Sequence, residues 1–279
     1  MTVRNTLVAF NDSPSSEMAL KAALIFQREF DTHVTGLSAC GLSRMSGQVR
    51  GWLPDSVHLA LKDAEEKLHE EVANKWAGMV SGNGRPEKTH WMQLPGDVNT
   101  NVIEQARFFD LIFIGQYDIG TADRQTILHP DRIALQSGKP LIHVPAAFDP
   151  GPITDHLIVA WDGKRAASRA LSDALQLHSE SQRISVLTIE EAQEKPQIRV
   201  DRLLEHLRRH DIETEHIAVT VKRKGHRSIA EAIMEVCAKH RPDSLIMGAY
   251  EHSKFREDTF GGVTETILRD ATFPVWMAH

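Results

Sequence analysis

Short apolar runs alternate with helical patterns along the whole chain. Residues 157–161 (Leu-Ile-Val-Ala-Trp) form a run without polar alternation, which is typical of a strand buried on both faces of a parallel sheet. Ala167, Ala170, Leu171 and Ala174 then recur at helical spacing. This alternation continues in both halves, so the pattern predicts a doubly wound α/β fold with helices on both faces of the sheet.

The pattern predicts five strands in each half. They lie near residues 6–10, 34–38, 90–94, 111–114 and 141–144 in the first half, and near residues 157–161, 184–189, 214–221, 245–247 and 274–278 in the second. The clearest predicted helices cover residues 55–79, 197–210 and 264–270. A further helix is expected to begin at Ser228, with Glu231 three residues later as in a capping box. Ahead of the first helix, Asp12 and Ser13 are expected to act as caps.

The two halves are related in sequence. Residues 7–11 align with residues 158–162 at an offset of 151, and residues 112–118 align with residues 245–251 at an offset of 133. The second copy therefore lacks about 18 residues that the first copy has between its second and third strands. We interpret this as a domain duplication, with domains at residues 1–148 and 155–279 and a proline-containing linker.

Composition narrows the class of protein. A net charge of −6 and a pI near 6.2 argue against a protein that coats nucleic acid. No apolar run approaches the ~18 residues of a membrane helix, and no signal-peptide core follows the first residue. Cys40 and Cys237 lie far apart, which excludes a disulfide framework or a CxxC zinc site. We therefore expect a cytoplasmic protein without nucleic-acid or membrane partners.

Four short segments carry a family resemblance. Residues 247–253 (Met-Gly-Ala-Tyr-Glu-His-Ser), 261–264 (Gly-Gly-Val-Thr), 274–275 (Pro-Val) and 159–163 (Val-Ala-Trp-Asp-Gly) resemble the universal stress protein family. The resemblance covers nearly the whole chain as two tandem domains. It implies two five-stranded parallel sheets of strand order 3-2-1-4-5, similar to adenine nucleotide alpha hydrolases. It also implies that some members bind ATP, that others do not, and that domains pair through their last strands.

The implied strand order places a candidate site. Ligands of open α/β sheets bind beyond the carboxyl ends of the strands where the strand order reverses, here between strands one and four. Asp162 ends strand one of the second domain and Gly248 ends strand four, so both are expected to face one crevice. In nucleotide-binding relatives an acid at the position of Asp162 contacts the adenosine, and a Gly-x2-Gly-x9-Gly-Ser/Thr loop wraps the ribose and phosphates.

This loop pattern is partly present in the second domain. Gly248 and Gly261 match the first and third glycines, and Gly262 replaces the serine or threonine. Val263 and Thr264 follow at the start of a helix, whose N–H groups and positive dipole end favour phosphate. The predicted cofactor is therefore ATP or another adenine nucleotide, with or without Mg²⁺.

Glu251 departs from the pattern because it stands where the second glycine belongs. A carboxylate ~4 Å from a phosphate at an effective dielectric near 20 costs on the order of 4 kcal/mol. Rotation into solvent, a bridging Mg²⁺, or nearby Lys254 and Arg256 would relieve that repulsion.

The first domain departs further from the pattern. Asn11 replaces the acid, Asp118 replaces the second glycine, and Leu128 and His129 stand where the third glycine belongs, followed by Pro130. We expect this domain to be a structural partner that does not bind nucleotide.

Two histidine arrangements suggest other chemistry. His206 and His210 lie four apart on a predicted helix, with His216 nearby, which is compatible with zinc or with an exposed cationic helix. His252 and Ser253 are adjacent but lack an orienting acid or a nucleophile elbow. The structural interpretation is favoured for both, so no catalytic or metal-binding residue is predicted.

Two hypotheses for the function remain open. The first is a regulatory stress-response protein that binds an adenine nucleotide and an unknown protein partner. The second is a dimerisation or scaffold protein whose sites have decayed. A third, slow ATP hydrolysis, lacks a general base beyond Asp162. The domains either pair within one chain through residues 141–144 and 275–278, or two chains form a homodimer.

Overall fold

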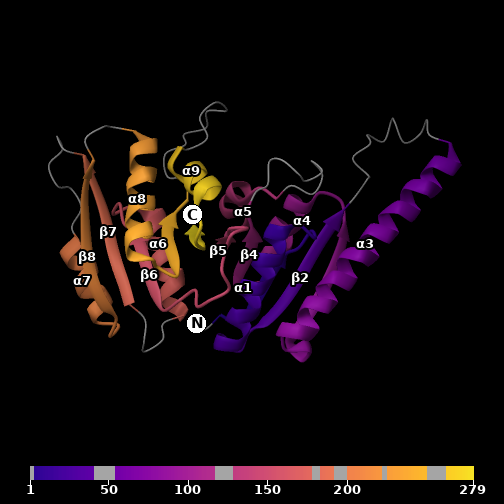
Figure 1. Ribbon diagram of the computed structural model, residues 1–279, viewed down its shortest axis with the longest axis horizontal. Coiled ribbons are helices and arrows are strands. Elements are labelled where there is room, and N and C mark those ends of the chain that lie inside the picture. The colour runs from indigo at the N-terminus through magenta and orange to yellow at the C-terminus, as the bar shows by residue number, and fades with distance from the viewer. Residues whose placement is uncertain are drawn as a thin grey trace.

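The computed structural model describes residues 3–40, 54–116, 128–177, 183–191, 200–221, 225–249 and 262–279. Helices and strands alternate through both halves (Figure 1). The first half contains β1 (Asn5–Ala9), α1 (Pro14–Phe30), β2 (His33–Cys40), α3 (Asp55–Asn83), η2 (Pro86–Lys88), β3 (Thr89–Pro95), α4 (Val98–Ala106), β4 (Leu111–Gly115), α5 (Pro130–Ser137) and β5 (Leu141–Val144). The second half contains β6 (His156–Ala160), α6 (Arg165–Ala174), η3 (Leu175–Leu177), β7 (Arg183–Glu191), α7 (Val200–Arg208), β8 (Glu213–Val221), α8 (His226–His240), β9 (Ser244–Gly248), α9 (Gly262–Asp270) and β10 (Val275–Ala278).

The ten strands form one sheet in the order β3-β2-β1-β4-β5-β10-β9-β6-β7-β8. Within each half the strands are parallel and follow the expected order 3-2-1-4-5, which confirms the predicted fold class. The two five-stranded sheets are joined into one, because β5 and β10 pair antiparallel, with His143 opposite Val275 and Leu141 opposite Met277. Of the two pairings that the sequence left open, this is the one within a single chain. We call this junction the seam. The halves remain distinct, since each keeps its own copy of the strand order.

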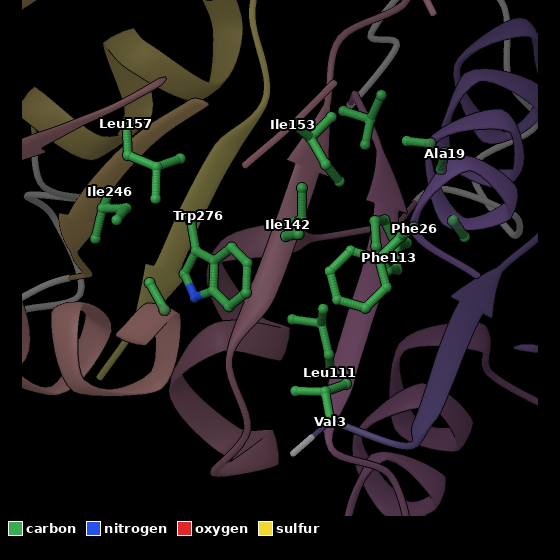
Figure 2. Packing of buried hydrophobic residues seen from close by; sticks show 14 of the residues in the cluster. Val3, Ala19, Phe26, Leu111, Phe113, Ile142, Ile153, Leu157, Ile246 and Trp276 are labelled. Atoms are coloured by element: carbon green, nitrogen blue, oxygen red, sulfur yellow. The ribbon is translucent and has the colours of Figure 1, made fainter. Parts of the chain in front are cut away.

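Apolar side chains cover both faces of this sheet. Helices α1, α3, α6 and α7 pack on one face, and α4, α5, α8 and α9 pack on the other. Neighbouring strand residues such as Leu7 and Val8 enter opposite cores, as strand geometry requires. Figure 2 shows Trp276 of β10 beside Ile142 of β5, so one of the cores continues across the seam. None of the described helices has the length and apolar character needed to cross a membrane.

Local sequence signals explain most helix boundaries. As predicted, Ser13 caps α1: its hydroxyl accepts the backbone N–H of Ser16 at 3.2 Å, and Pro14 follows at the first helical position. The prediction that Ser228 caps α8 was wrong. Gly225 adopts φ +146°, a conformation that favours glycine, and the helix begins immediately afterwards at His226.

His143 is a buried polar side chain at the seam. It is fully buried on β5, on the same face as Leu141, and neither ring nitrogen has a hydrogen-bond partner within the part of the chain that the structure describes. Burial alone lowers the pKa of His143 from 6.5 to about 3, because the charged imidazolium has no water or counter-charge there. The seam therefore requires a neutral histidine.

This burial predicts an acid-sensitive stability. In the unfolded chain His143 takes up a proton as the pH falls through 6.5, whereas the folded protein resists protonation down to about pH 3. The unfolded state is thus favoured as the pH drops through that window. Relative to a His143→Leu variant, the wild type should lose about 2 kcal/mol of unfolding free energy between pH 7 and pH 5. Urea titrations of both proteins at the two pH values measure this difference, and equal losses would contradict it.

Candidate functional site

The structure brings two of the predicted site residues to adjacent strand ends. In the parallel pair β6 and β9, Ala160 lies opposite Met247. Asp162 follows β6 by two residues, and Gly248 is the last residue of β9. In the strand order β9-β6-β7 this is the place where the strand order of the second half reverses. The geometry therefore fits the crevice that open α/β sheets use for ligands.

Asp162 offers a half-exposed carboxylate at this edge. Its Oδ1 accepts the backbone N–H of Lys164 at 3.0 Å, and the Lys164 Nζ lies 3.7 Å from Oδ2. The intervening Gly163 has φ +77°, which allows the tight turn between β6 and α6. The side chain of Asp162 remains half exposed to solvent and can accept hydrogen bonds from a ligand.

Gly248 is required for packing inside the protein. A Cβ built on Gly248 would lie 2.6 Å from the backbone nitrogen of Ala167 and 2.8 Å from the carbonyl carbon of Ala166. A Cβ on Gly115 of the first half would lie 2.5 Å from the carbonyl carbon of Ser15. Both glycines let a strand end approach the start of a helix. Sequence analysis assigned Gly248 to a loop that wraps a nucleotide, but the contact with the helix explains the glycine at this position in both halves.

The start of α9 supplies the remaining described residues of the predicted site. A Cβ on Gly262 would lie 2.7 Å from the Cβ of His226, so the first residues of α8 and α9 are close together. Val263 is half buried and Thr264 is 5% exposed, so Thr264 can offer little beyond its backbone N–H. The first N–H groups of a helix lack acceptors within that helix, and its dipole is positive there. This end of α9 is suited to an anion.

Two predicted residues of this loop, Glu251 and Gly261, lie outside the described residues. The same holds for His252 and Ser253, and for Asp118 of the first half. The structure therefore brings Asp162 and Gly248 to adjacent strand ends and sets the start of α9 beside the start of α8.

At the corresponding edge of the first half, two polar groups already bond within the protein. The Asn11 Oδ1 accepts the backbone N–H of Ser13 at 3.3 Å and its hydroxyl at 2.7 Å. At the start of α5, the backbone N–H of His129 donates to the Asn99 Oδ1 at 2.7 Å, and Pro130 has no N–H to offer. The start of α5 therefore has two fewer backbone N–H groups to offer a phosphate, because the N–H of His129 is already bonded and Pro130 has none.

A lysine on α3 also neutralises this edge of the first half. Lys75 forms ion pairs with Asp12 and, at 2.6 Å, with Glu17 of α1. Asp12 occupies the position of Gly163 in the second half and shares its left-handed backbone, with φ +64°. Sequence analysis missed Lys75 and Asn99, because both act through contacts between distant segments and belong to no motif.

The histidine arrangements offer no described metal site. The rings of His206 and His210 meet edge to face with centroids 4.8 Å apart, while the His216 Nε2 lies 2.9 Å from the Thr188 hydroxyl. Within the described ranges, no group of three or more His, Cys, Asp or Glu side chains is placed to hold a metal ion. Cys237 is a buried thiol whose burial raises its pKa to about 12, so it is unreactive at neutral pH.

The packing of Gly248 generates a stability prediction. Gly248→Ala should lower the free energy of unfolding by about 1–3 kcal/mol, because the new Cβ collides with the backbone of α6. Gly78→Ala is the matched control: it lies within α3 with nothing within 4 Å of the added carbon, and should raise stability by about 0.5–1 kcal/mol. Denaturant unfolding measures both values, and a neutral Gly248→Ala would contradict the assigned packing.

Comparisons with known proteins agree with this architecture. Residues 154–279 match the universal stress protein family. A universal stress protein structure from Archaeoglobus fulgidus is similar to this chain, with a TM-score of 0.74 at 16% identity, and the match covers 99% of this chain and 96% of that one. A protein of unknown function from Pseudomonas aeruginosa has a TM-score of 0.54 at 15% identity, covering 99% and 92% of the two chains. A putative universal stress protein from the same species has a TM-score of 0.51 at 15% identity, covering 99% and 93%.

No curated protein matches the sequence. The similarity to solved structures extends over almost the entire chain and, at these identities, concerns the fold. The family match is confined to the half that carries Asp162 and α9. Residues 154–279 therefore match a universal stress protein domain, and the residues before them repeat its strand order.

Proposed function

We propose that the second half binds an adenine nucleotide, ATP with or without Mg²⁺, and that the protein acts as a regulator rather than as an enzyme. In this proposal the first half is the structural partner of the second. The observation that supports it most directly is the difference between the two crevices. The second half has a half-exposed Asp162 and an α9 that begins without proline, whereas the first half has an internally bonded Asn11 and an α5 that begins with Pro130.

The residues present fit an adenine nucleotide in two places. The Asp162 carboxylate can accept hydrogen bonds from the hydroxyl groups of the ribose. The backbone N–H groups of Gly262, Val263 and Thr264 can donate to phosphate oxygens at the positive end of α9. We assign no catalytic residue, and the domain boundaries at residues 148 and 155 remain a prediction.

Paired substitutions in the two halves test nucleotide binding. Isothermal titration with ATP and Mg²⁺ should show binding to the wild type and at least tenfold weaker binding to Asp162→Ala, which removes the acceptor for the ribose. Asn11→Ala changes the equivalent position of the first half and should bind as the wild type does. Equal affinities for all three proteins would reject the assignment of Asp162.

A proline substitution tests the contribution of α9. Val263→Pro gives α9 the residue that α5 has at the equivalent position, removing one N–H from the first turn, where proline is tolerated. The affinity for ATP should fall at least threefold, while adenosine, which has no phosphate, should be unaffected. An identical loss for ATP and adenosine would show that the substitution disturbs the crevice as a whole.

The alternative function is that of a scaffold protein without a ligand, and two observations support it. Packing alone accounts for Gly248, and Glu251 interrupts the glycine pattern. If Glu251 is what prevents binding, Glu251→Gly should create or strengthen ATP binding in the same titration. Glu87→Gly, at an exposed position in the first half, is the control for loss of one charge. No gain from Glu251→Gly would remove Glu251 as the explanation.

A further inference from the structure

In the amino-terminal part of α3, residues 55–71, none of the side chains that the structure describes is buried; we call this segment the α3 overhang. Figure 1 shows this end of α3 standing clear of the rest of the ribbon. It belongs to the connection between β2 and β3, which runs over residues 41–88, whereas the connection between β7 and β8 in the second half runs only over residues 192–212. The α3 overhang is therefore an addition to the fold that both halves share.

Burial along α3 shows where its packing begins. Every side chain that the structure describes between residues 55 and 71 is exposed or half exposed. Among the described side chains of α3, Val72 is the first that is buried, followed by Trp76 and Val80. By contrast, Val200, the first residue of α7 in the second half, is already buried. The core therefore holds only the carboxyl-terminal part of α3 in place.

Exposed apolar side chains gather on this segment. Three of the four large apolar residues that are exposed in the described part of the chain lie here: Val57 at 37%, Leu59 at 62% and Leu68 at 41%. Val57, Ala64 and Leu68 are spaced by seven and four residues, which places them on one face of the helix. Leu59 lies about 200° around the helix from Val57, on the opposite side. Val57, Ala64 and Leu68 define the apolar face of the α3 overhang.

The charges around this face are mostly negative. Residues 55–71 contain six carboxylates and two lysines, a net charge of −4 in a chain whose total is −6. Lys62 and Glu66 form an exposed ion pair at 3.6 Å, which leaves the acidic excess in place. A second copy of the same overhang, an anionic membrane or a nucleic acid would each be repelled by it. The complementary surface is positively charged.

We propose that the α3 overhang docks a cationic amphipathic helix of a partner protein. The apolar side chains of the partner would pack on the face formed by Val57, Ala64 and Leu68, and its lysines or arginines would lie against the surrounding carboxylates. An amphipathic helix that lays its apolar face against a complementary helix surface is a common mode of recognition. The opposite charges speed association and set the choice of partner. This surface is independent of the proposed nucleotide site.

A designed peptide tests the proposal on the full-length protein. The probe is a fluorescent peptide of roughly 18 residues, long enough to form a helix, with leucine at helical spacing and lysine elsewhere. Fluorescence anisotropy should show saturable binding to the wild type. The double variant Val57→Ser/Leu68→Ser should bind at least tenfold more weakly, a loss of about 1.4 kcal/mol. Leu59→Ser and Phe108→Ser, which alter exposed apolar residues off this face, should leave the affinity unchanged.

Two further probes separate the apolar contribution from charge alone. A peptide of the same composition with its leucines scrambled should bind at least tenfold more weakly than the patterned one. If both peptides bind equally, or if Val57→Ser/Leu68→Ser binds as the wild type does, the surface attracts positive charge without a docking face and the proposal fails. Light scattering tests whether a second copy of this chain binds the same face. If the wild type self-associates and Val57→Ser/Leu68→Ser does not, the occupant is a second copy and the proposal fails.

Discussion

The antiparallel pairing of β5 with β10 determines the arrangement of the rest of the molecule. Each half ends in a strand whose outer edge would otherwise leave backbone N–H and C=O groups unpaired. Pairing the two edges satisfies these groups and lets one core continue from Ile142 to Trp276. The Gln116 side chain strengthens the junction, because it donates to the Arg269 carbonyl at 2.6 Å and accepts the backbone N–H of Ala146 at 3.1 Å. The position of α9 therefore depends on the first half as well as on its own.

The seam also contains polar atoms that the fold leaves without partners among the described residues. Both nitrogens of His143 and the indole nitrogen of Trp276 belong to this group. An unpaired buried polar atom costs on the order of 1–3 kcal/mol, so this junction is held by apolar contact and strand pairing in spite of these side chains. An aliphatic residue in place of His143 would fill the same space without that cost.

Much of the fold was predictable from periodicity. Continuous apolar runs such as residues 157–161 mark buried parallel strands, and the offsets between the halves reveal the repeated strand order. The sequence pointed to pairing through residues 141–144 and 275–278 but could not decide between one chain and two, because these runs are equally apolar in either case. The start of α8 was misplaced because the backbone of Gly225, rather than the hydroxyl of Ser228, decides where the helix begins. Of the candidate site, the sequence locates Asp162 and α9 but cannot show that Asn99 meets His129 from 30 residues away.

Joining two similar halves in one chain has a consequence for how the molecule can change. In a homodimer every substitution appears in both subunits, so the two copies of a crevice stay identical. Here α5 begins with Pro130, while Val263 occupies the equivalent place in the sequence of the second half. Because the two copies are joined in one chain, each can change independently. One crevice can therefore lose hydrogen-bond donors while the other retains them.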